Sequence, residues 1–239
     1  MIQFVTLSFL SLFKIHQRKS QVFQQLDILA VQSAPIILIC VSFAAVVTVL
    51  ESSFHMKLVI QSDSMVPGFS ALLILRELGA IVTALLLTSR AGAGIASEVA
   101  SQKVSEQIEA LKLLGVNPYE YIVAPRLVAS VLGTILLVAT ANVAALFISM
   151  LVSAHKLSIQ PEIFWQMMNR FVEFKDFILS LLKAACFGAI IPLVSCYYGF
   201  RSDPGAEGVG KTTTQSVVMA SILIIMFDFI LSSVFSYFY

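Results

Sequence analysis

Residues 205–212 have the sequence GAEGVGKT, which fits the nucleotide-binding pattern G-x-x-x-x-G-K-[ST] at every fixed position. In enzymes with that pattern, backbone N–H groups of the glycine-rich loop hold phosphate, and the lysine reaches the terminal phosphates. Further along the chain, the apolar run IIMFD ends in Asp228, much like the metal-holding Asp of the same enzymes. These two segments together could belong to a small ATPase.

The residues around this pattern argue against that chemistry. A phosphate-binding loop needs a β-strand before it and a soluble helix after it, within a βαβ unit. Here the preceding segment, ILSLLKAACFGAIIPLVSCYYGF, is too long and continuous for a strand, and a long apolar stretch follows. Asp228 lies on that same stretch instead of on a separate strand. We interpret the glycines as a tight turn between helices, and we expect the chain not to be an enzyme.

Long stretches of the chain hold almost no charge. Of its 239 residues, 58% are hydrophobic and 12% are charged, against roughly a quarter charged in an ordinary soluble domain. A membrane core requires about 20 apolar residues of helix. The stretches that satisfy this requirement are 28–50, 68–99, 121–154, 176–200 and 211–238. We therefore predict one all-α integral membrane domain, residues 1–239, with five transmembrane helices.

The N-terminal segment does not resemble a cleaved signal peptide. Its apolar part, IQFVTLSFLSLF, precedes the basic residues Lys14, Arg18 and Lys19, whereas a signal peptide has its charges first. We predict that residues 1–27 form a helix in the membrane interface. The excess of Lys and Arg in the loops on the same side predicts a cytoplasmic N-terminus and a C-terminus on the opposite side.

The remaining reactive side chains form no recognisable site. Cys40, Cys186 and Cys196 all fall inside predicted spans, and the histidines are scattered without the spacing of metal ligands. We predict no catalytic residue, no metal site and no cofactor in this chain. The net charge of +1 gives no reason to expect a nucleic-acid partner.

A short amphipathic helix is predicted at 105–116, in the loop between the second and third spans. Ser105 is a favourable N-cap, and Gly115 ends the pattern. The apolar residues that recur at helical spacing are Ile108, Leu111 and Leu114. The helix has no core of its own on which to bury its apolar side. It could dock into a groove on a soluble partner, or pack against neighbouring loops or the membrane surface. The residues expected to contact a partner are Glu106, Glu109, Leu111 and Gly115.

Charged residues also lie within the predicted spans, namely Arg76, Glu77, Lys183 and Asp228. A charge near the centre of a bilayer costs about 2.5–3.5 kcal/mol, so each needs a partner or water. At the rise of a helix, the residues lie ~10–15 Å below the outer ends of their spans, at one level. They could form a structural ion-pair network, or line a cavity that receives a lipid headgroup, with a base near phosphate.

Two blocks resemble the MlaE/YrbE family of ABC-transporter permeases. They are RELGAIVTALLLTSRAGAGIASEVASQKVSEQIEALKLLGVNPYEYIVAPRLVA (76–129) and GAEGVGKTTTQSVVMASILIIMFDFILSSVF (205–235). The resemblance implies a homodimeric permease in the bacterial inner membrane, bound through the loop helix to a cytoplasmic ATPase. It also implies a periplasmic MCE-domain partner and phospholipid as cargo. ATP and Mg would be bound by the ATPase chain. The four charged positions match residues associated with the family's lipid-binding cavity.

Other functions use some of the same features. A proton relay through the four charged residues would suit a proton-coupled secondary transporter. The sequence lacks the internal inverted repeat and the paired broken helices that are typical of that class. A structural membrane scaffold is a third alternative, because a partner-binding helix by itself does not exclude it. We expect the permease subunit of an ABC-type phospholipid transport complex.

Overall fold

The computed structural model describes residues 4, 6, 8, 19–59 and 61–237. Every regular element in this part of the chain is a helix, and five continuous helices are long and apolar enough to cross a membrane. These five run over Lys19–Val59, Val66–Val104, Tyr119–Leu157, Phe174–Gly199 and Ala206–Ser236. The predicted all-α membrane fold is therefore confirmed.

Several spans combine α-helical segments with single π-helical turns, labelled η. The first comprises α2 (Lys19–Leu26), η2 (Asp27–Val31) and α3 (Ala34–Val59). The second comprises α4 (Val66–Leu73), η3 (Ile74–Leu78), α5 (Gly79–Leu87), η4 (Thr88–Gly92) and α6 (Ala93–Val104). The rest of the chain forms α7 (Gln107–Leu113), η5 (Tyr119–Val123), α8 (Ala124–Leu157), α9 (Pro161–Phe171), α10 (Phe174–Gly199) and α11 (Ala206–Ser236).

The predicted interfacial helix, 1–27, lies partly outside the described residues. Its described C-terminal part forms α2, which continues through η2 toward α3. Pro35 lies in the first turn of α3, directly after a turn at residues 32–33. Proline is tolerated at that position because the N–H groups of a first turn have no partner within the helix.

Helix α3 illustrates why these segments need a membrane. The side chains buried against the rest of the protein, Ile37, Val41, Ala45 and Val49, recur at intervals of four and form one stripe. The other faces are apolar as well, and Phe43 (68% exposed) and Val47 (58% exposed) have no protein cover. A helix that is apolar on all sides but packed on one suits a bilayer, whose hydrocarbon covers the exposed side.

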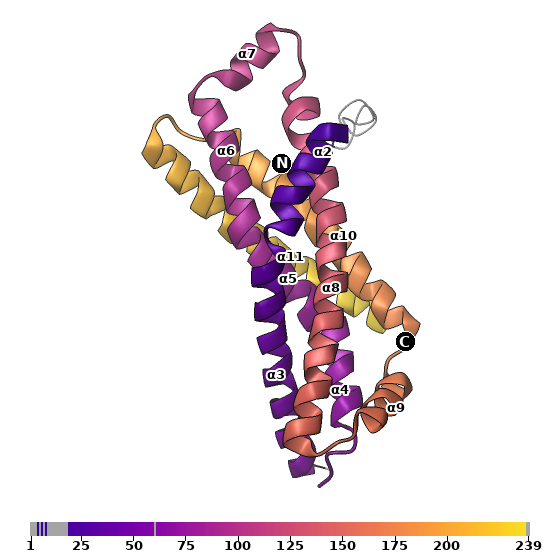
Figure 1. Ribbon diagram of the computed structural model, residues 1–239. Coiled ribbons are helices and arrows are strands. Elements are labelled where there is room, and N and C mark those ends of the chain that lie inside the picture. The colour runs from indigo at the N-terminus through magenta and orange to yellow at the C-terminus, as the bar shows by residue number, and fades with distance from the viewer. Residues whose placement is uncertain (1–3, 5, 7, 9–18, 60, 238–239) are drawn as a thin grey trace.

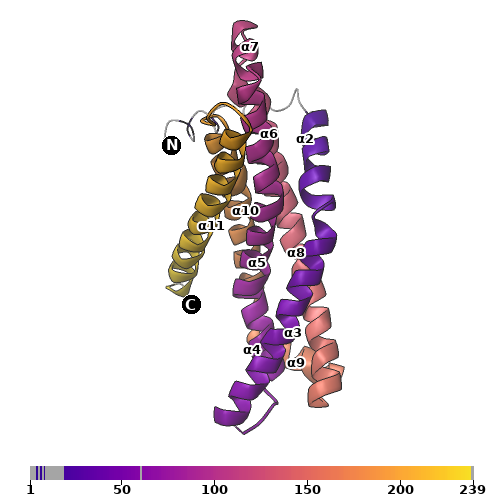
Figure 2. The same ribbon diagram turned by 90° about the vertical axis from the view of Figure 1, so that its left-hand side faces the viewer.

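The two ends of the bundle carry different short helices (Figure 1). Helix α7 and the start of α2 lie at one end, and α9 and the connection from α3 to α4 lie at the other. Helix α10 packs against α8, α6 and α11, whereas α3 packs mainly against α8. Helix α11 lies on one side of the bundle, away from α3 (Figure 2). Only 17% of its most apolar stretch is buried.

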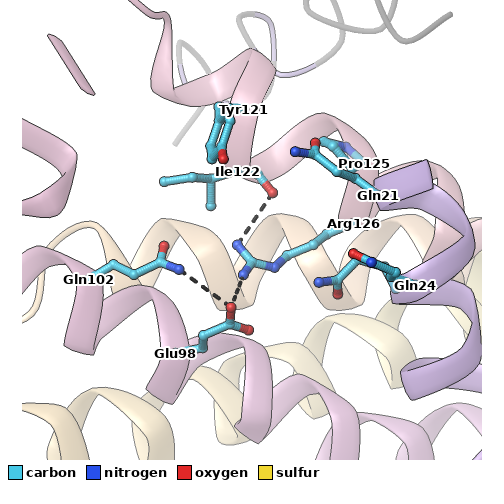
Figure 3. Close-up of a pocket in the computed structure, with 9 residues that line it drawn as sticks. Gln21, Gln24, Glu98, Gln102, Tyr121, Ile122, Pro125 and Arg126 are labelled. Carbon is cyan, nitrogen blue, oxygen red and sulfur yellow. Dashed lines mark hydrogen bonds and ion pairs between the residues drawn. The ribbon is translucent and has the colours of Figure 1, made fainter. Parts of the chain in front are cut away.

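An ion pair joins two spans near the α7 end. Arg126 of α8 places Nη2 2.6 Å from Oε1 of Glu98 on α6, and its Nη1 donates to the carbonyl oxygen of Ile122 (Figure 3). The Arg126 side chain is only 5% exposed, whereas that of Glu98 is 52% exposed. The pair therefore fixes α6 to α8 at the edge of the protein interior.

A glycine–asparagine contact fixes the second span in its middle. A Cβ added to Gly79 would lie 1.7 Å from Oδ1 of Asn142 on α8. Nδ2 of the same asparagine donates to Oγ of Ser180 on α10 at 2.9 Å. The absence of a side chain at Gly79 thus lets α8 and α10 approach the span directly after η3.

Candidate functional site

The π-helical turn η3 introduces two charged residues into the second span. The N–H of Gly79 donates to the carbonyl oxygen of Ile74, five residues earlier, as a π turn requires. Arg76 and Glu77 lie within this turn. The Arg76 carbonyl oxygen accepts a hydrogen bond from Lys183 Nζ at 2.8 Å. Such single turns occur often at functional sites because they change the direction of side chains and the use of carbonyl groups.

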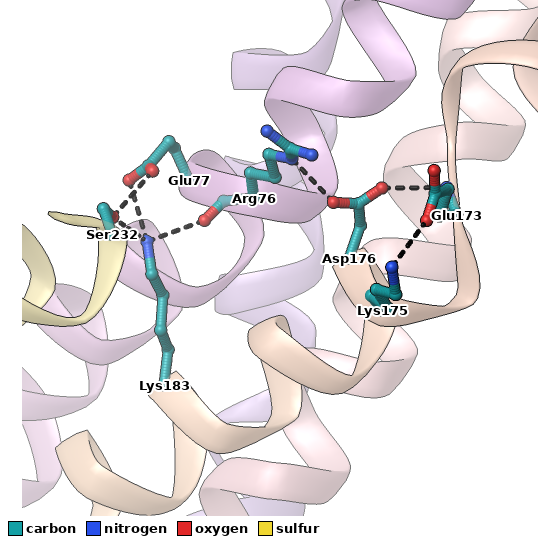
Figure 4. Close-up of polar contacts among 7 residues, drawn as sticks. All are labelled: Arg76, Glu77, Glu173, Lys175, Asp176, Lys183 and Ser232. Carbon is teal, nitrogen blue, oxygen red and sulfur yellow. Dashed lines mark hydrogen bonds and ion pairs between the residues drawn. The ribbon is translucent and has the colours of Figure 1, made fainter. Parts of the chain in front are cut away.

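Lys183 is the centre of an ion-pair network that joins three spans (Figure 4). Its side chain on α10 is fully buried. Nζ lies 3.0 Å from Oε2 of Glu77 and 2.8 Å from Oδ1 of Asp228 on α11. It also donates to Oγ of Ser232 at 2.7 Å, and that hydroxyl donates to Oε1 of Glu77 at 2.9 Å. An ammonium group has three donors, so internal acceptors already occupy Lys183.

Arg76 has a different partner and is more accessible. Its Nε donates to Oδ1 of Asp176 at 2.6 Å, and the Asp176 side chain is fully buried. Oδ2 of Asp176 accepts from the backbone N–H of Glu173 in the capping box that begins α10. The guanidinium carbon of Arg76 lies 5.8 Å from the centre of the Phe235 ring. The Arg76 side chain is 27% exposed, so part of the guanidinium faces outward.

The exposed side chains of the network are those of one base and one acid. Glu77 is 40% exposed and Arg76 27% exposed, whereas Lys183 is fully buried and the Asp228 side chain is 12% exposed. A ligand that carries both a negative and a positive group could therefore contact Arg76 and Glu77 without displacing Lys183. Lys183 is placed to hold the acidic side chains in position.

The structure brings together all four charged residues singled out in the sequence. Sequence reasoning missed Asp176 and Ser232. Asp176 stands three residues after Glu173 at the start of a span. An acidic residue is common there because it caps the helix and interacts favourably with its positive N-terminal end, so nothing marks it as a site residue. Ser232 is one of two adjacent serines in an apolar run, and nothing in the sequence indicates which one faces the lysine.

The predicted loop helix exists as α7, with an end that agrees with the sequence. Gly115 has a positive φ of 72°. Its N–H donates to Lys112 O, and the N–H of Val116 donates to Leu111 O. This pattern is the Schellman motif of a helix that ends in glycine. The prediction of Ser105 as N-cap is wrong, because Ser105 is the C-cap of α6 and its hydroxyl donates to Ser101 O.

The side chains of the α7 loop divide into buried and exposed sets. Ile108 is buried and Leu111 packs partly against the core. Leu113 and Leu114 are 89% and 77% exposed. Of the predicted contact residues, Glu106 has a left-handed backbone at the start of α7, and Glu109 accepts a hydrogen bond from Lys103. This contact holds the pKa of Glu109 below its usual value.

Of the segment GAEGVGKT, only Gly205 lies in the turn between two spans, and residues 206–212 form the start of α11. The prediction of a turn is therefore wrong for Gly208 and Gly210, which are helical. Gly205 has a φ of 90°, and α11 begins at the next residue. A Cβ added to Gly208 would lie 2.2 Å from the Asp203 carbonyl oxygen, so the turn is tight. Lys211 lies inside α11 and is exposed. Helices flank the turn on both sides, so the strand of a nucleotide-binding loop does not precede it.

The fold and the site define a multi-pass membrane protein with a buried ion-pair network that joins three spans. The family model described as permease MlaE matches residues 22–234. The chain belongs to the MlaE permease family.

Individual relatives agree with this assignment. A probable ABC transporter permease protein of Rickettsia typhi is 33% identical over 213 residues, covering 89% of this chain and 82% of the relative. The intermembrane phospholipid transport system permease protein MlaE of Haemophilus influenzae is 30% identical over 212 residues, covering 88% and 81%. The chloroplastic protein TRIGALACTOSYLDIACYLGLYCEROL 1 of Arabidopsis thaliana is 35% identical over 168 residues, covering 70% of this chain and 48% of the relative.

Proposed function

We propose that this chain is the permease subunit of an ABC-type phospholipid transport complex in a bacterial inner membrane. The similarity to a phospholipid transport permease supports the cargo class. The observation that carries the proposal is the charged network inside apolar spans, with Arg76 and Glu77 partly exposed beside a buried Lys183. Burying so many charges costs free energy. Such charges are kept where they bind a ligand or fix a unique arrangement of helices.

The headgroup site consists of Arg76, Glu77, Lys183 and Asp228, and these residues have different roles. Arg76 contacts the lipid phosphate, because a guanidinium offers several donors and this one is partly exposed. Lys183 is a positioning residue, since internal acceptors surround its Nζ. Asp228 holds the Lys183 ammonium in place, and Glu77 limits the site to headgroups that tolerate a nearby carboxylate.

Three partner chains attach to different parts of the bundle: one at each end and one along the side formed by α11. A cytoplasmic ATPase, which binds ATP and Mg, docks on the α7 loop, and Leu113 and Leu114 provide the exposed apolar contacts. This places the N-terminus in the cytoplasm and the C-terminus in the periplasm, where an MCE-domain protein receives the lipid. The poorly covered face of α11 packs against a second copy in a homodimer.

Mass spectrometry of lipids that co-purify with the full-length chain tests the headgroup site. Arg76→Ala should lower the amount of bound phospholipid relative to the wild type. Lys175→Ala is the matched control, since Lys175 lies near the same end of α10, its side chain is 65% exposed, and its ion pair is with Glu173. Equal phospholipid content in the Arg76→Ala variant and the wild type, with assembly intact, would refute Arg76 as the phosphate contact.

A further inference from the structure

A second polar site lies at the α7 end, apart from the Lys183 network. It is a cavity of about 190 Å³ between α2, α6 and the start of the third span (Figure 3). Its polar lining comprises Gln21, Gln24 and Gln25 from α2, Glu98 and Gln102 from α6, and Arg126 from α8. Four neutral amides and one ion pair make this lining more polar than is usual between helices long enough to cross a membrane.

Two buried polar atoms of this lining lack a hydrogen-bond partner among the described residues. They are Nε of Arg126 and Oε1 of Gln102. Arg126 is buried, with 4% of the whole residue exposed. Its Nη2 pairs with Glu98, but this contact does not involve Nε. Gln102 donates through Nε2 to Oε1 of Glu98 at 3.4 Å, which leaves its own oxygen as an acceptor. Two of the residues that line the pocket thus carry one unused donor and one unused acceptor, both buried, and unsatisfied buried groups of this kind are costly.

The chemistry of the lining selects a ligand with both kinds of group. A phosphate oxygen satisfies the arginine donor, and guanidinium groups suit phosphate. An ammonium N–H satisfies the Gln102 oxygen and the half-exposed Glu98 carboxylate. Because Arg126 and Glu98 cancel in charge, a zwitterion enters without leaving net charge in the pocket. A quaternary ammonium has no N–H to donate, so it satisfies neither acceptor.

The position of the pocket favours a lipid as the source of this headgroup. Helix α2 leads into the first span, and Phe23, beside the pocket glutamine Gln24, is 68% exposed. On the other side of the pocket, Tyr121 of η5 is 42% exposed. Aromatic side chains beside a polar site are typical of the level where headgroups meet acyl chains. A lipid could therefore place its headgroup among the glutamines and its chains along α2.

We propose that this pocket binds the headgroup of a zwitterionic phospholipid whose amine carries N–H donors, as in phosphatidylethanolamine. The site is separate from the Lys183 network and serves the leaflet at the α7 end. It does not depend on the headgroup site proposed above, because it shares no residue with that site.

Native mass spectrometry of the full-length chain in detergent tests the proposal. The delipidated protein is titrated separately with phosphatidylethanolamine, phosphatidylcholine and soluble glycerophosphoethanolamine. Phosphatidylethanolamine should bind about tenfold more tightly than phosphatidylcholine, as expected for one charge-assisted hydrogen bond. Glu98→Gln should abolish this preference. Binding of the soluble compound without binding of the lipid would contradict a lipid site.

Variants of α2 keep the test independent of the buried ion pair. The double substitution Gln24→Leu with Gln25→Leu should lower phosphatidylethanolamine binding severalfold, and Gln107→Leu, an exposed glutamine on α7, should not. The α2 double variant leaves the Lys183 network intact, so a loss of binding in it separates this pocket from the proposed headgroup site. Equal binding of the two lipids by the wild type, or full binding by the α2 double variant, would overturn the proposal.

Discussion

The fully buried ammonium of Lys183 lies 2.8 Å from the carboxylate of Asp228, on the neighbouring helix α11. The same nitrogen contacts Glu77, so one lysine compensates two acids from two different spans. In an environment of low dielectric constant, removing the lysine leaves two carboxylates close together without a cation. The network therefore links the proposed headgroup site to the packing of α10 and α11.

Lys183→Met should destabilise the chain strongly, by about 3–5 kcal/mol as for other broken buried ion pairs. Combining it with Asp228→Leu should recover part of the loss, because the second change removes one of the two carboxylates that have lost their cation. Thermal unfolding in detergent measures both effects, and Lys175→Met serves as a surface control. Additive losses in the double variant would show that the two side chains do not form a pair.

Gly79→Ala should destabilise the middle of the bundle, because the new methyl group would overlap Oδ1 of Asn142. Gly94→Ala is the matched control, since a Cβ there meets nothing within 4 Å. In a helix interior, that control should be neutral or stabilising by up to about 1 kcal/mol. Relative to the wild type, the unfolding temperature should fall in Gly79→Ala and should stay the same or rise in Gly94→Ala. A Gly79→Ala variant as stable as Gly94→Ala would contradict the described packing.

Leu113→Asp and Leu114→Asp should each weaken co-purification of the proposed ATPase partner, because both side chains are exposed and apolar. Leu111→Asp should instead lower the yield or stability of the chain itself, since Leu111 packs partly against the core. The comparison uses affinity purification followed by quantitation of the partner. Unchanged partner recovery in both exposed variants would remove α7 as the docking helix.

The Glu109 carboxyl should titrate below the usual value of about 4.3 for glutamate. The hydrogen bond from Lys103 stabilises the charged form and lowers the folded-state pKa. A depressed pKa stabilises the folded loop above the unfolded value, and this contribution is lost as pH falls through the folded value. Lys103→Gln should return the pKa toward normal in an NMR titration of the labelled side chain. A pKa insensitive to that substitution would show that the two groups do not interact.

The sequence predicts the spans well because their signal is composition, which does not depend on tertiary contacts. It also predicts the common level of the four charged residues, because helix rise fixes depth. It does not predict the π-helical turn at Arg76 and Glu77, since no residue type specifies an extra backbone residue in a span. The sequence also does not indicate that Asp176 pairs with Arg76, because the capping box at the start of α10 already explains an acidic residue at that position.

The α7 loop shows the same limit at a finer scale. Helical periodicity predicts that Ile108, Leu111 and Leu114 share one face, but the described helix buries Ile108 and leaves Leu114 exposed. The reason is that α7 ends at Leu113, so Leu114 is already in the C-terminal turn that Gly115 closes. A prediction from periodicity assumes that the helix continues past the last apolar residue, whereas α7 ends before Leu114.

Phospholipid transfer by the reconstituted complex tests the central claim most directly. Proteoliposomes containing this chain, the proposed ATPase and the proposed periplasmic partner are supplied with ATP, and transfer of labelled phospholipid to the partner side is measured. The account predicts transfer that requires ATP, is lost in Arg76→Ala and survives in Lys175→Ala. Transfer driven by a pH gradient without ATP, or undiminished in the Arg76→Ala complex, would contradict it.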